Sequence, residues 1–264
     1  MMKKQKQKKL EAYEYPLVSI ITVVRNGQAY IQRCIDSVLA QSYPNIEHVI
    51  IDGASTDDTI DILKKNTHQI AFWLSEVDKG IYDAMNKAIS YVNGEWILFL
   101  GSDDILLPGF SEMAYQLNER SAIYYGRVIC QGKIQYGEVD QDTLALRGIA
   151  HQAIFYPACI FTKKHYRFNI QYVVYADYIL NLQCWQDPEI KFQFYDIVIS
   201  DFNYTGVSST VEDHLFSKNR NGLIRRYLGS NTYYRYRWTL FKEKIKRKIN
   251  KRVKMMEKLL TLFS

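Results

Sequence analysis

An apolar run that ends at two adjacent carboxylates is the feature that most constrains what this chain can fold into. Residues 95–104 read Glu-Trp-Ile-Leu-Phe-Leu-Gly-Ser-Asp-Asp, and such a continuous apolar stretch is typical of a strand buried on both faces. The strand would deliver Asp103 and Asp104 to the carboxyl edge of a sheet, where open α/β folds bind their ligands. Because adjacent carboxylates repel each other, we expect a divalent cation there that holds a substrate diphosphate.

Three further apolar segments precede this strand and alternate with helical patterns. We expect strands at 17–24, 46–51 and 70–74, each followed by a turn and by apolar residues at helical spacing. Further on we expect a helix over 109–120, a strand over 122–129 with a hairpin, and then mixed structure. Alternating strands and helices imply right-handed crossovers, and therefore an α/β class fold with a Rossmann-like, doubly wound, mainly parallel sheet.

The charge of the chain is divided between basic ends and an acidic middle. Residues 218–264 hold 15 Lys or Arg against 2 acidic residues, and residues 1–10 hold 5 Lys, although the whole chain carries only +6. Apolar side chains such as Trp238 and Phe241 interleave with the basic ones in the tail, which predicts a basic amphipathic helix on an anionic membrane surface. A solvated helix is the alternative. The acidic middle argues against nucleic acid as a partner.

Targeting and redox signals favour a cytoplasmic protein. The 4 cysteines are scattered without a CxxC pair, which indicates reduced thiols and neither a zinc site nor a disulfide framework. The basic amino end is not followed by the apolar core of a signal peptide, and nowhere do 18 apolar residues run together. We therefore expect a chain that is neither exported nor membrane-spanning.

Two loops carry polar clusters just before predicted helices. Asp52 ends the second strand, where it fits either a helix-capping loop or a carboxylate that accepts a hydrogen bond from a uracil N–H or a ribose hydroxyl. Asp78, Lys79, Asp83 and Asn86 gather at the start of the third helix, where the dipole and free amides favour phosphate. The alternative for the second cluster is an i,i+4 pair of Asp83 with Lys87 on an ordinary core helix whose apolar stripe is Ile81, Met85 and Ile89.

Four segments, in this order and at this spacing, carry a resemblance. Residues 18–26, 51–59, 78–88 and 99–104 closely resemble family 2 glycosyltransferases of the GT-A fold. The resemblance is specific over 17–110 and extends more weakly to about residue 210. It implies a nucleotide-diphospho-sugar transferase fold, a UDP-sugar as the donor, and Mn²⁺ or Mg²⁺ as the cofactor.

By this resemblance, Thr22, Val24 and Asp52 line the nucleobase pocket, and Asp103 closes the DxD-type metal motif. Gly101 stands where the first Asp of that motif usually lies, so either Asp104 shares the metal or the diphosphate supplies more of its ligands. Ser102 in the same loop is a substrate-binding candidate, although Ser102 to Asp104 also fits a helix cap.

The helix after Gly80 has Met85 where the family often has an Arg, which leaves Lys79 and Lys87 as diphosphate candidates. Asp177, in Tyr-Ala-Asp-Tyr, looks like the family's carboxylate base for the acceptor hydroxyl, although it also fits a helix cap. His151, followed by Gln152, resembles a His-Gln pair of the polysaccharide-assembly branch, and we expect it either to position substrate or to be structural.

These expectations combine into one hypothesis. The chain would be an inverting, metal-dependent glycosyltransferase that acts on a glycan, in particular a lipid-diphosphate-linked oligosaccharide, as in O-antigen or capsule assembly at the inner face of the cell membrane. We expect a basic extension over 1–16, a catalytic domain over 17–217 with a donor half (17–110) and an acceptor half (111–217), and a membrane-associating tail over 218–264.

Two other classes of protein stay open. A nucleotidyltransferase on a similar sheet would need a Gly-rich phosphate loop, whereas Arg25-Asn26-Gly27 offers one Arg and one Gly after the first strand. A non-catalytic nucleotide-sugar-binding module would bind the donor without turning it over.

Overall fold

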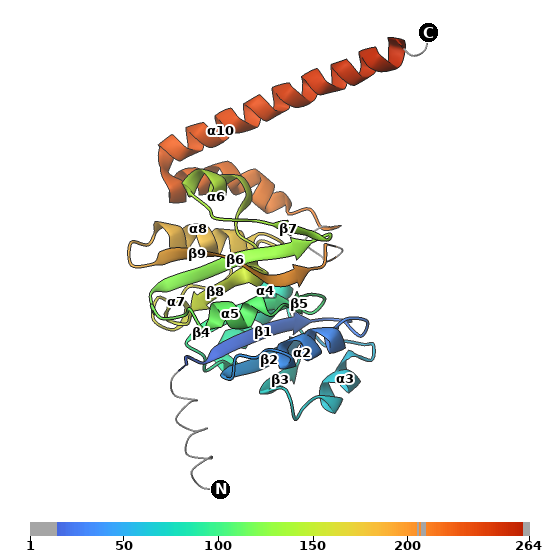
Figure 1. Ribbon diagram of the computed structural model, residues 1–264, viewed down its shortest axis with the longest axis vertical. Coiled ribbons are helices and arrows are strands. Elements are labelled where there is room, and N and C mark those ends of the chain that lie inside the picture. The colour runs from blue at the N-terminus through green and yellow to red at the C-terminus, as the bar shows by residue number, and fades with distance from the viewer. Residues whose placement is uncertain (1–14, 205, 207–209, 261–264) are drawn as a thin grey trace.

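The computed structural model describes residues 15–204, 206 and 210–260, so the basic segment at residues 1–10 lies outside the described residues (Figure 1). A nine-stranded sheet runs through the body in the order β3-β2-β1-β4-β8-β6-β9-β5, with β7 paired to β6. The first four strands are parallel: β1 (Val18–Val24), β2 (Ile46–Asp52), β3 (Phe72–Ser75) and β4 (Trp96–Gly101). Their crossovers carry α2 (Ile31–Leu39), α3 (Thr59–Lys65), α4 (Ile81–Ala88) and η1 (Ile89–Tyr91). The Rossmann-like half expected from the sequence is therefore confirmed.

The second half of the sheet is mixed. It contains β5 (Ile105–Leu106), β6 (Ala122–Cys130), β7 (Lys133–Gln135), β8 (Ile154–Pro157) and β9 (Lys191–Phe202). Strand β8 joins the halves because it pairs antiparallel with both β4 and β6. The helices between these strands are α5 (Gly109–Ala114), α6 (Gln141–Arg147), η2 (His151–Ala153), α7 (Cys159–Thr162) and α8 (Ala176–Gln186).

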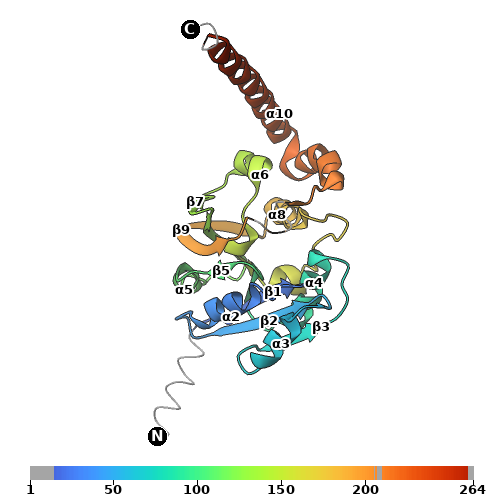
Figure 2. The same cartoon turned by 90° about the vertical axis from the view of Figure 1, so that its right-hand side faces the viewer.

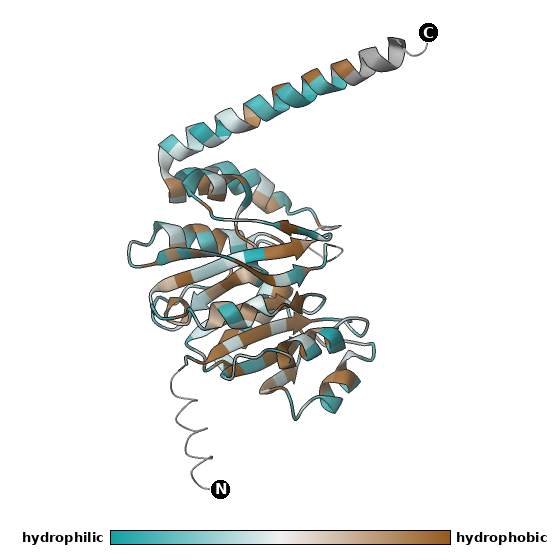
Figure 3. Ribbon diagram, viewed as in Figure 1, coloured by the Kyte–Doolittle hydropathy of each residue, from teal (hydrophilic) through white to brown (hydrophobic). Residues whose placement is uncertain are grey.

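Apolar residues dominate the central strands, which are largely brown in Figure 3, and they pack into buried clusters on both faces of the sheet. Successive residues of β1 alternate between faces, so Ile20 packs in one buried cluster and Ile21 in another. Phe99 and Leu98 of β4 alternate in the same way. Burial on both faces explains why these central strands read as continuous apolar runs in the sequence.

Three local expectations differ from the structure. The third strand begins at Phe72. Helix α5 ends at Ala114, because the chain then turns so that the Asn118 and Glu119 amides donate to the Tyr124 hydroxyl, at 3.3 and 3.0 Å. In α4 the buried stripe is Tyr82, Ala84, Met85, Ala88 and then Ile89, whereas Ile81 is exposed. The expected apolar stripe was therefore wrong at one position.

The long helix α10 (His214–Leu260) has two arms that meet at Gly229, whose φ of 82° breaks the helical geometry. The first arm packs over α8 and α6 and buries Phe216, Ile224 and Leu228 in the core. The second arm still packs on the body at Arg235 and Tyr236 and then leaves it, as Figures 1 and 2 show. The helix thus begins before Lys218, and its first arm belongs to the packed domain. Within the described part of the chain, every helix is too short or too polar to cross a bilayer.

Candidate active site

The site lies at the carboxyl edge of the parallel strands. Val24 of β1 pairs with Asp52 of β2, and Val23 pairs with Gly101 of β4, so the ends of three strands meet at this edge. The loop that follows β4 carries Ser102, Asp103 and Asp104, and this placement is the one that the apolar run predicted.

Asp104 is a buried carboxylate held by the backbone. It is 2% exposed, its Oδ2 accepts from the Gly101 amide at 3.2 Å, and its Oδ1 accepts from the Asn203 amide at 2.9 Å. Burial, and in smaller part the charge of Asp103, raises the pKa of Asp104 to about 6. Asp104 therefore ties the loop after β4 to the end of β9.

Asp103 is the more exposed carboxylate of the pair. Its Oδ2 accepts from the Asn203 side-chain amide at 3.3 Å, and burial raises its pKa above the ordinary value. A Cβ added at Gly101 would lie 2.5 Å from Asp104 Oδ2 and 3.1 Å from Asp103 Oδ1. Both carboxylates therefore occupy the space where a side chain at position 101 would stand, which is a physical reason for glycine there.

The carboxylate oxygens of this loop fit a cation that a bound substrate would also coordinate. Among the residues that the structure describes, no three His, Cys, Asp or Glu side chains come together as a metal site. Mg²⁺ is commonly held by one or two carboxylates together with substrate phosphates and water, and Asp103 offers one such carboxylate. The oxygens of Asp104 already accept backbone hydrogen bonds, so Asp103 is the better candidate of the two.

His151 contacts Asp177 and is also influenced by the charges of the acidic pair after β4. Its Nδ1 is 3.3 Å from Asp177 Oδ2, and the charges of Asp104 and Asp103 also act on the imidazole. Burial opposes protonation of His151, but the hydrogen bond and charge of Asp177, with the charges of Asp104 and Asp103, outweigh it, and the pKa of His151 is raised. The structure thus brings together the candidate base, the His and the carboxylate pair that the sequence singled out.

Asp177 lies in the first turn of α8, where its Oδ1 accepts from the Tyr178 amide at 2.8 Å. The same oxygen is 2.9 Å from the Tyr82 hydroxyl of α4. Burial, and then the charge of Asp177, raises the pKa of Tyr82 well above its ordinary value. Tyr82 was missed in the sequence, although a tyrosine on a buried helix face needs a partner for its hydroxyl.

The nucleoside candidates are held by protein contacts. Asp52 is fully buried and accepts from the Ser55 amide at 2.9 Å, the Ser55 hydroxyl, and the Ser75 hydroxyl at 2.6 Å. Thr22 is also fully buried, with its hydroxyl 2.9 Å from His48 Nε2. Val24 packs in the small core between β1, α2 and α3. Val24 and Asp52 therefore lie at the edge, and Thr22 lies beneath it.

The candidates around α4 have local partners as well. The Lys79 amide donates to Asp83 Oδ2 at 2.9 Å, and Lys87 Nζ lies 3.7 Å from the same carboxylate. Asn86 binds the backbone of Phe168 on both sides, donating to its carbonyl at 2.8 Å and accepting from its amide at 3.0 Å. The contacts of Asp83 and Asn86 thus stabilise the start of α4 and a neighbouring loop. Ser102 faces the loop after β1, where a Cβ at Gly27 would lie 3.6 Å from its Oγ.

Comparisons with known proteins agree on one family. The chain matches the family model described as Glycosyl transferase family 2 over residues 19–172. A PGL/p-HBAD biosynthesis glycosyltransferase from Mycobacterium bovis is 34% identical over 214 residues, which cover 77% of this chain and 83% of the relative.

Solved structures are similar in fold. S. aureus TarS 1-349 in complex with UDP-GlcNAc has a TM-score of 0.62 at 16% identity and covers 83% of this chain and 73% of its own. The mannosyltransferase PcManGT from Pyrobaculum calidifontis, in complex with GDP-Man and Mn²⁺, has a TM-score of 0.56 at 17% identity and covers 71% of this chain and 57% of its own.

The GT-A type α/β fold expected from the sequence is confirmed by these similarities. The family model spans more than half of the chain, and the mycobacterial relative matches most of its length. On this evidence, the chain belongs to glycosyl transferase family 2.

Proposed function

We propose that the protein is an inverting glycosyltransferase that moves a sugar from a nucleoside diphosphate donor, a UDP-sugar, to a hydroxyl of a glycan acceptor. The observation that carries this proposal is the arrangement around His151, which links the candidate base Asp177 to the acidic pair after β4. Direct displacement at an anomeric carbon needs a carboxylate that takes the proton of the attacking hydroxyl, and it needs a positive charge beside the leaving diphosphate. Asp177 would be the carboxylate, and a cation held by the acidic pair would be the positive charge.

Asp103 would hold Mn²⁺ or Mg²⁺ together with the donor diphosphate. Such a cation supplies positive charge that stabilises the departing diphosphate oxygen. Asp104 holds the loop that carries Asp103, through the Gly101 and Asn203 amides. The structurally similar PcManGT is in complex with Mn²⁺, which supports the choice of metal.

Asp177 would take the proton of the acceptor hydroxyl. Its Oδ1 already accepts hydrogen bonds from protein groups, which leaves Oδ2, the oxygen beside His151, for the incoming hydroxyl. His151 would orient this oxygen and balance the negative charge of the acidic pair.

The donor nucleoside would lie at the edge formed by Val24 and Asp52, with Thr22 supporting β1 from below. Lys79, exposed at the start of α4, would approach the diphosphate, and Asp83 and Asn86 would hold that helix start in place. Ser102 would contact the donor from the loop after β4. The structurally similar TarS 1-349 is in complex with UDP-GlcNAc, which supports a uridine donor.

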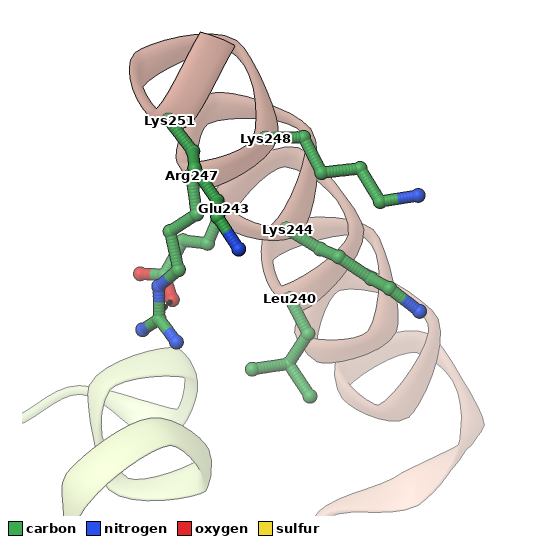
Figure 4. Close-up of a pocket in the computed structure, with 6 residues that line it drawn as sticks. All are labelled: Leu240, Glu243, Lys244, Arg247, Lys248 and Lys251. Carbon is green, nitrogen blue, oxygen red and sulfur yellow. Dashed lines mark ion pairs between the residues drawn. The ribbon is translucent and has the colours of Figure 1, made fainter. Parts of the chain in front are cut away.

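The acceptor would be lipid-linked, in particular a lipid-diphosphate-linked oligosaccharide of cell-surface polysaccharide biosynthesis such as O-antigen assembly. The second arm of α10 supports this proposal, because Trp238, Phe241, Ile245, Ile249 and Val253 recur every three or four residues and are 42–57% exposed. A hollow of about 400 Å³ on this arm is lined by Leu240, Glu243 and four cations, Lys244, Arg247, Lys248 and Lys251 (Figure 4). An exposed apolar stripe beside many basic side chains suits an anionic membrane surface at the cytoplasmic face. We therefore propose a membrane, and not a nucleic acid, as the partner of this arm.

A panel of nucleotide sugars with added Mn²⁺ tests the function. Release of nucleoside diphosphate that depends on a glycan acceptor, and that Asp177→Asn abolishes, is the expected result. Release of sugar 1-phosphate in place of nucleoside diphosphate would favour a nucleotidyltransferase instead, because attack at the nucleotidyl phosphorus expels the sugar phosphate. Binding of donor without turnover under every condition would favour a non-catalytic module.

A further inference from the structure

The segment that carries Asp177 is held from two sides by residues that are distant in the sequence. The amide of Val174 donates to Asp213 Oδ2 at 3.1 Å. The carbonyl of the same residue accepts from the Tyr82 hydroxyl. The peptide groups that lead into α8 are therefore fixed by α4 on one side and by the residue before α10 on the other.

Asp213 performs two tasks with one buried carboxylate. Its Oδ1 accepts from the Phe216 amide at 2.9 Å and thereby caps the first turn of α10, while its Oδ2 holds Val174. The rings on either side of this contact also pack together. The Tyr175 ring stacks on Phe216 with centroids 4.1 Å apart, and the Tyr178 ring meets Phe216 edge-on at 5.4 Å. The start of α10 therefore lies directly against the turn that carries Asp177.

Tyr82 has one hydroxyl hydrogen and two acceptors within reach, the Val174 carbonyl and Asp177 Oδ1 at 2.9 Å. While Asp177 is ionised, a hydrogen bond to the carboxylate is the stronger choice. Once Asp177 has taken a proton, its Oδ1 is a weaker acceptor, and the Val174 carbonyl can receive the same hydrogen. One side chain can therefore serve both protonation states of Asp177 without leaving a buried donor unsatisfied.

We infer that Tyr82 and Asp213 are positioning residues for Asp177, and that the first turn of α10 is part of the catalytic centre. This inference rests on the proposed role of Asp177 as the base. In the step they support, the acceptor O–H proton moves to Asp177 Oδ2 while the acceptor oxygen bonds to the anomeric carbon. The bond from that carbon to the diphosphate oxygen breaks, and its electron pair leaves with the nucleoside diphosphate.

The Tyr82→Phe variant tests the hydroxyl, since it keeps the ring that packs against Phe168. We expect kcat to fall about tenfold or more with the donor KM unchanged. We also expect the acid limb of the kcat/KM profile to move to higher pH, because ionised Asp177 loses a donor. Among the described residues, the titratable groups that face or act on Asp177 besides Tyr82 include His151, Tyr136 and Tyr156.

The Asp213→Asn variant tests the second contact. Asparagine can still cap α10 through its carbonyl oxygen, but it turns an amide N–H₂ toward Val174 or leaves the Val174 amide without an acceptor. We expect the same loss in kcat at unchanged donor KM. Tyr166→Phe is the matched control, since Tyr166 donates to Asp187 at 2.9 Å in another part of the fold.

The Asp177→Asn variant, assayed in parallel, separates the inference from the function on which it rests. Loss of turnover in Asp177→Asn, with reduced kcat in Tyr82→Phe and Asp213→Asn but not in Tyr166→Phe, supports the inference. Suppose instead that Asp177→Asn is inactive while Tyr82→Phe and Asp213→Asn match Tyr166→Phe in kcat and pH profile. The inference about Tyr82 and Asp213 is then overturned, and the proposed role of Asp177 as the base is retained. Normal turnover by Asp177→Asn would overturn both.

Discussion

The imidazole of His151 and the carboxylate of Asp177 are in contact, with Nδ1 3.3 Å from Oδ2. The same imidazole is also under the charges of Asp103 and Asp104, so one side chain links the two acidic parts of the site. A change at His151 should therefore affect proton transfer and the negative charge near the diphosphate together.

For His151→Gln we predict a fall in kcat of about 10- to 100-fold, because glutamine keeps a hydrogen-bond donor but loses the positive charge. A pH effect on stability should accompany it. The pKa of His151 is raised in the folded chain, so its contribution to stability is complete below the ordinary histidine pKa of 6.5 and is lost as pH rises through the folded pKa. Urea unfolding between pH 5 and 9 measures this loss, and an identical pH dependence in the variant would contradict the prediction.

Asp104 gives a pH dependence of the same sign as His151, but at lower pH. Its pKa is raised from 3.8 to about 6, so the folded chain holds more protons than the unfolded one in this window, and the free energy of unfolding falls as pH rises from about 4 to 6. We predict that Asp104→Asn flattens this fall by about 2 kcal/mol in metal-free protein. Asp58→Asn, which removes an exposed carboxylate, is the control and should keep the wild-type slope.

Gly101 should not tolerate a side chain while Asp104 keeps its position, since a Cβ would lie 2.5 Å from Asp104 Oδ2. We predict that Gly101→Ala destabilises the protein by about 1–3 kcal/mol. The double variant Gly101→Ala with Asp104→Ala should recover part of this loss, because the clashing oxygen is gone. Additive losses in thermal unfolding would show that the two positions are not in conflict.

The second arm of α10 should govern membrane binding without affecting the fold. A chain that ends after Arg237 keeps the buried side chains of Phe216, Ile224, Leu228 and Tyr236 and the Arg235 contact with Asp142 at 2.8 Å. We predict that it no longer sediments with anionic vesicles but unfolds at nearly the wild-type temperature. Neutral vesicles and raised salt are the controls, and undiminished binding to anionic vesicles would refute a membrane role for this arm.

Much of the part formed by β1 to β4 could be predicted because its information is local. The apolar runs that became β1 and β4 are nearly continuous, since both faces of these strands are buried, and the polar residues that follow β1, β2 and β4 mark the edge of the sheet. The positions of Asp103 and Asp104 after β4 follow directly from this pattern.

The contacts that complete the site could not be predicted, because they join residues far apart in the chain. Tyr82 and Asp177 are separated by 95 positions, and Val174 and Asp213 by 39. No periodicity in one segment reveals such a partner. The end of α5 depends in the same way on a hydroxyl of the following strand, that of Tyr124.

Turnover of a nucleotide sugar by Asp103→Asn, measured across a range of Mn²⁺ concentrations beside the wild type and Asp58→Asn, tests the central claim most directly. We predict that Asp103→Asn loses at least about 100-fold in rate and that added Mn²⁺ does not restore it, whereas Asp58→Asn behaves as the wild type. A wild-type rate in Asp103→Asn would contradict the claim that a carboxylate after β4 holds the cation and, through it, the leaving diphosphate.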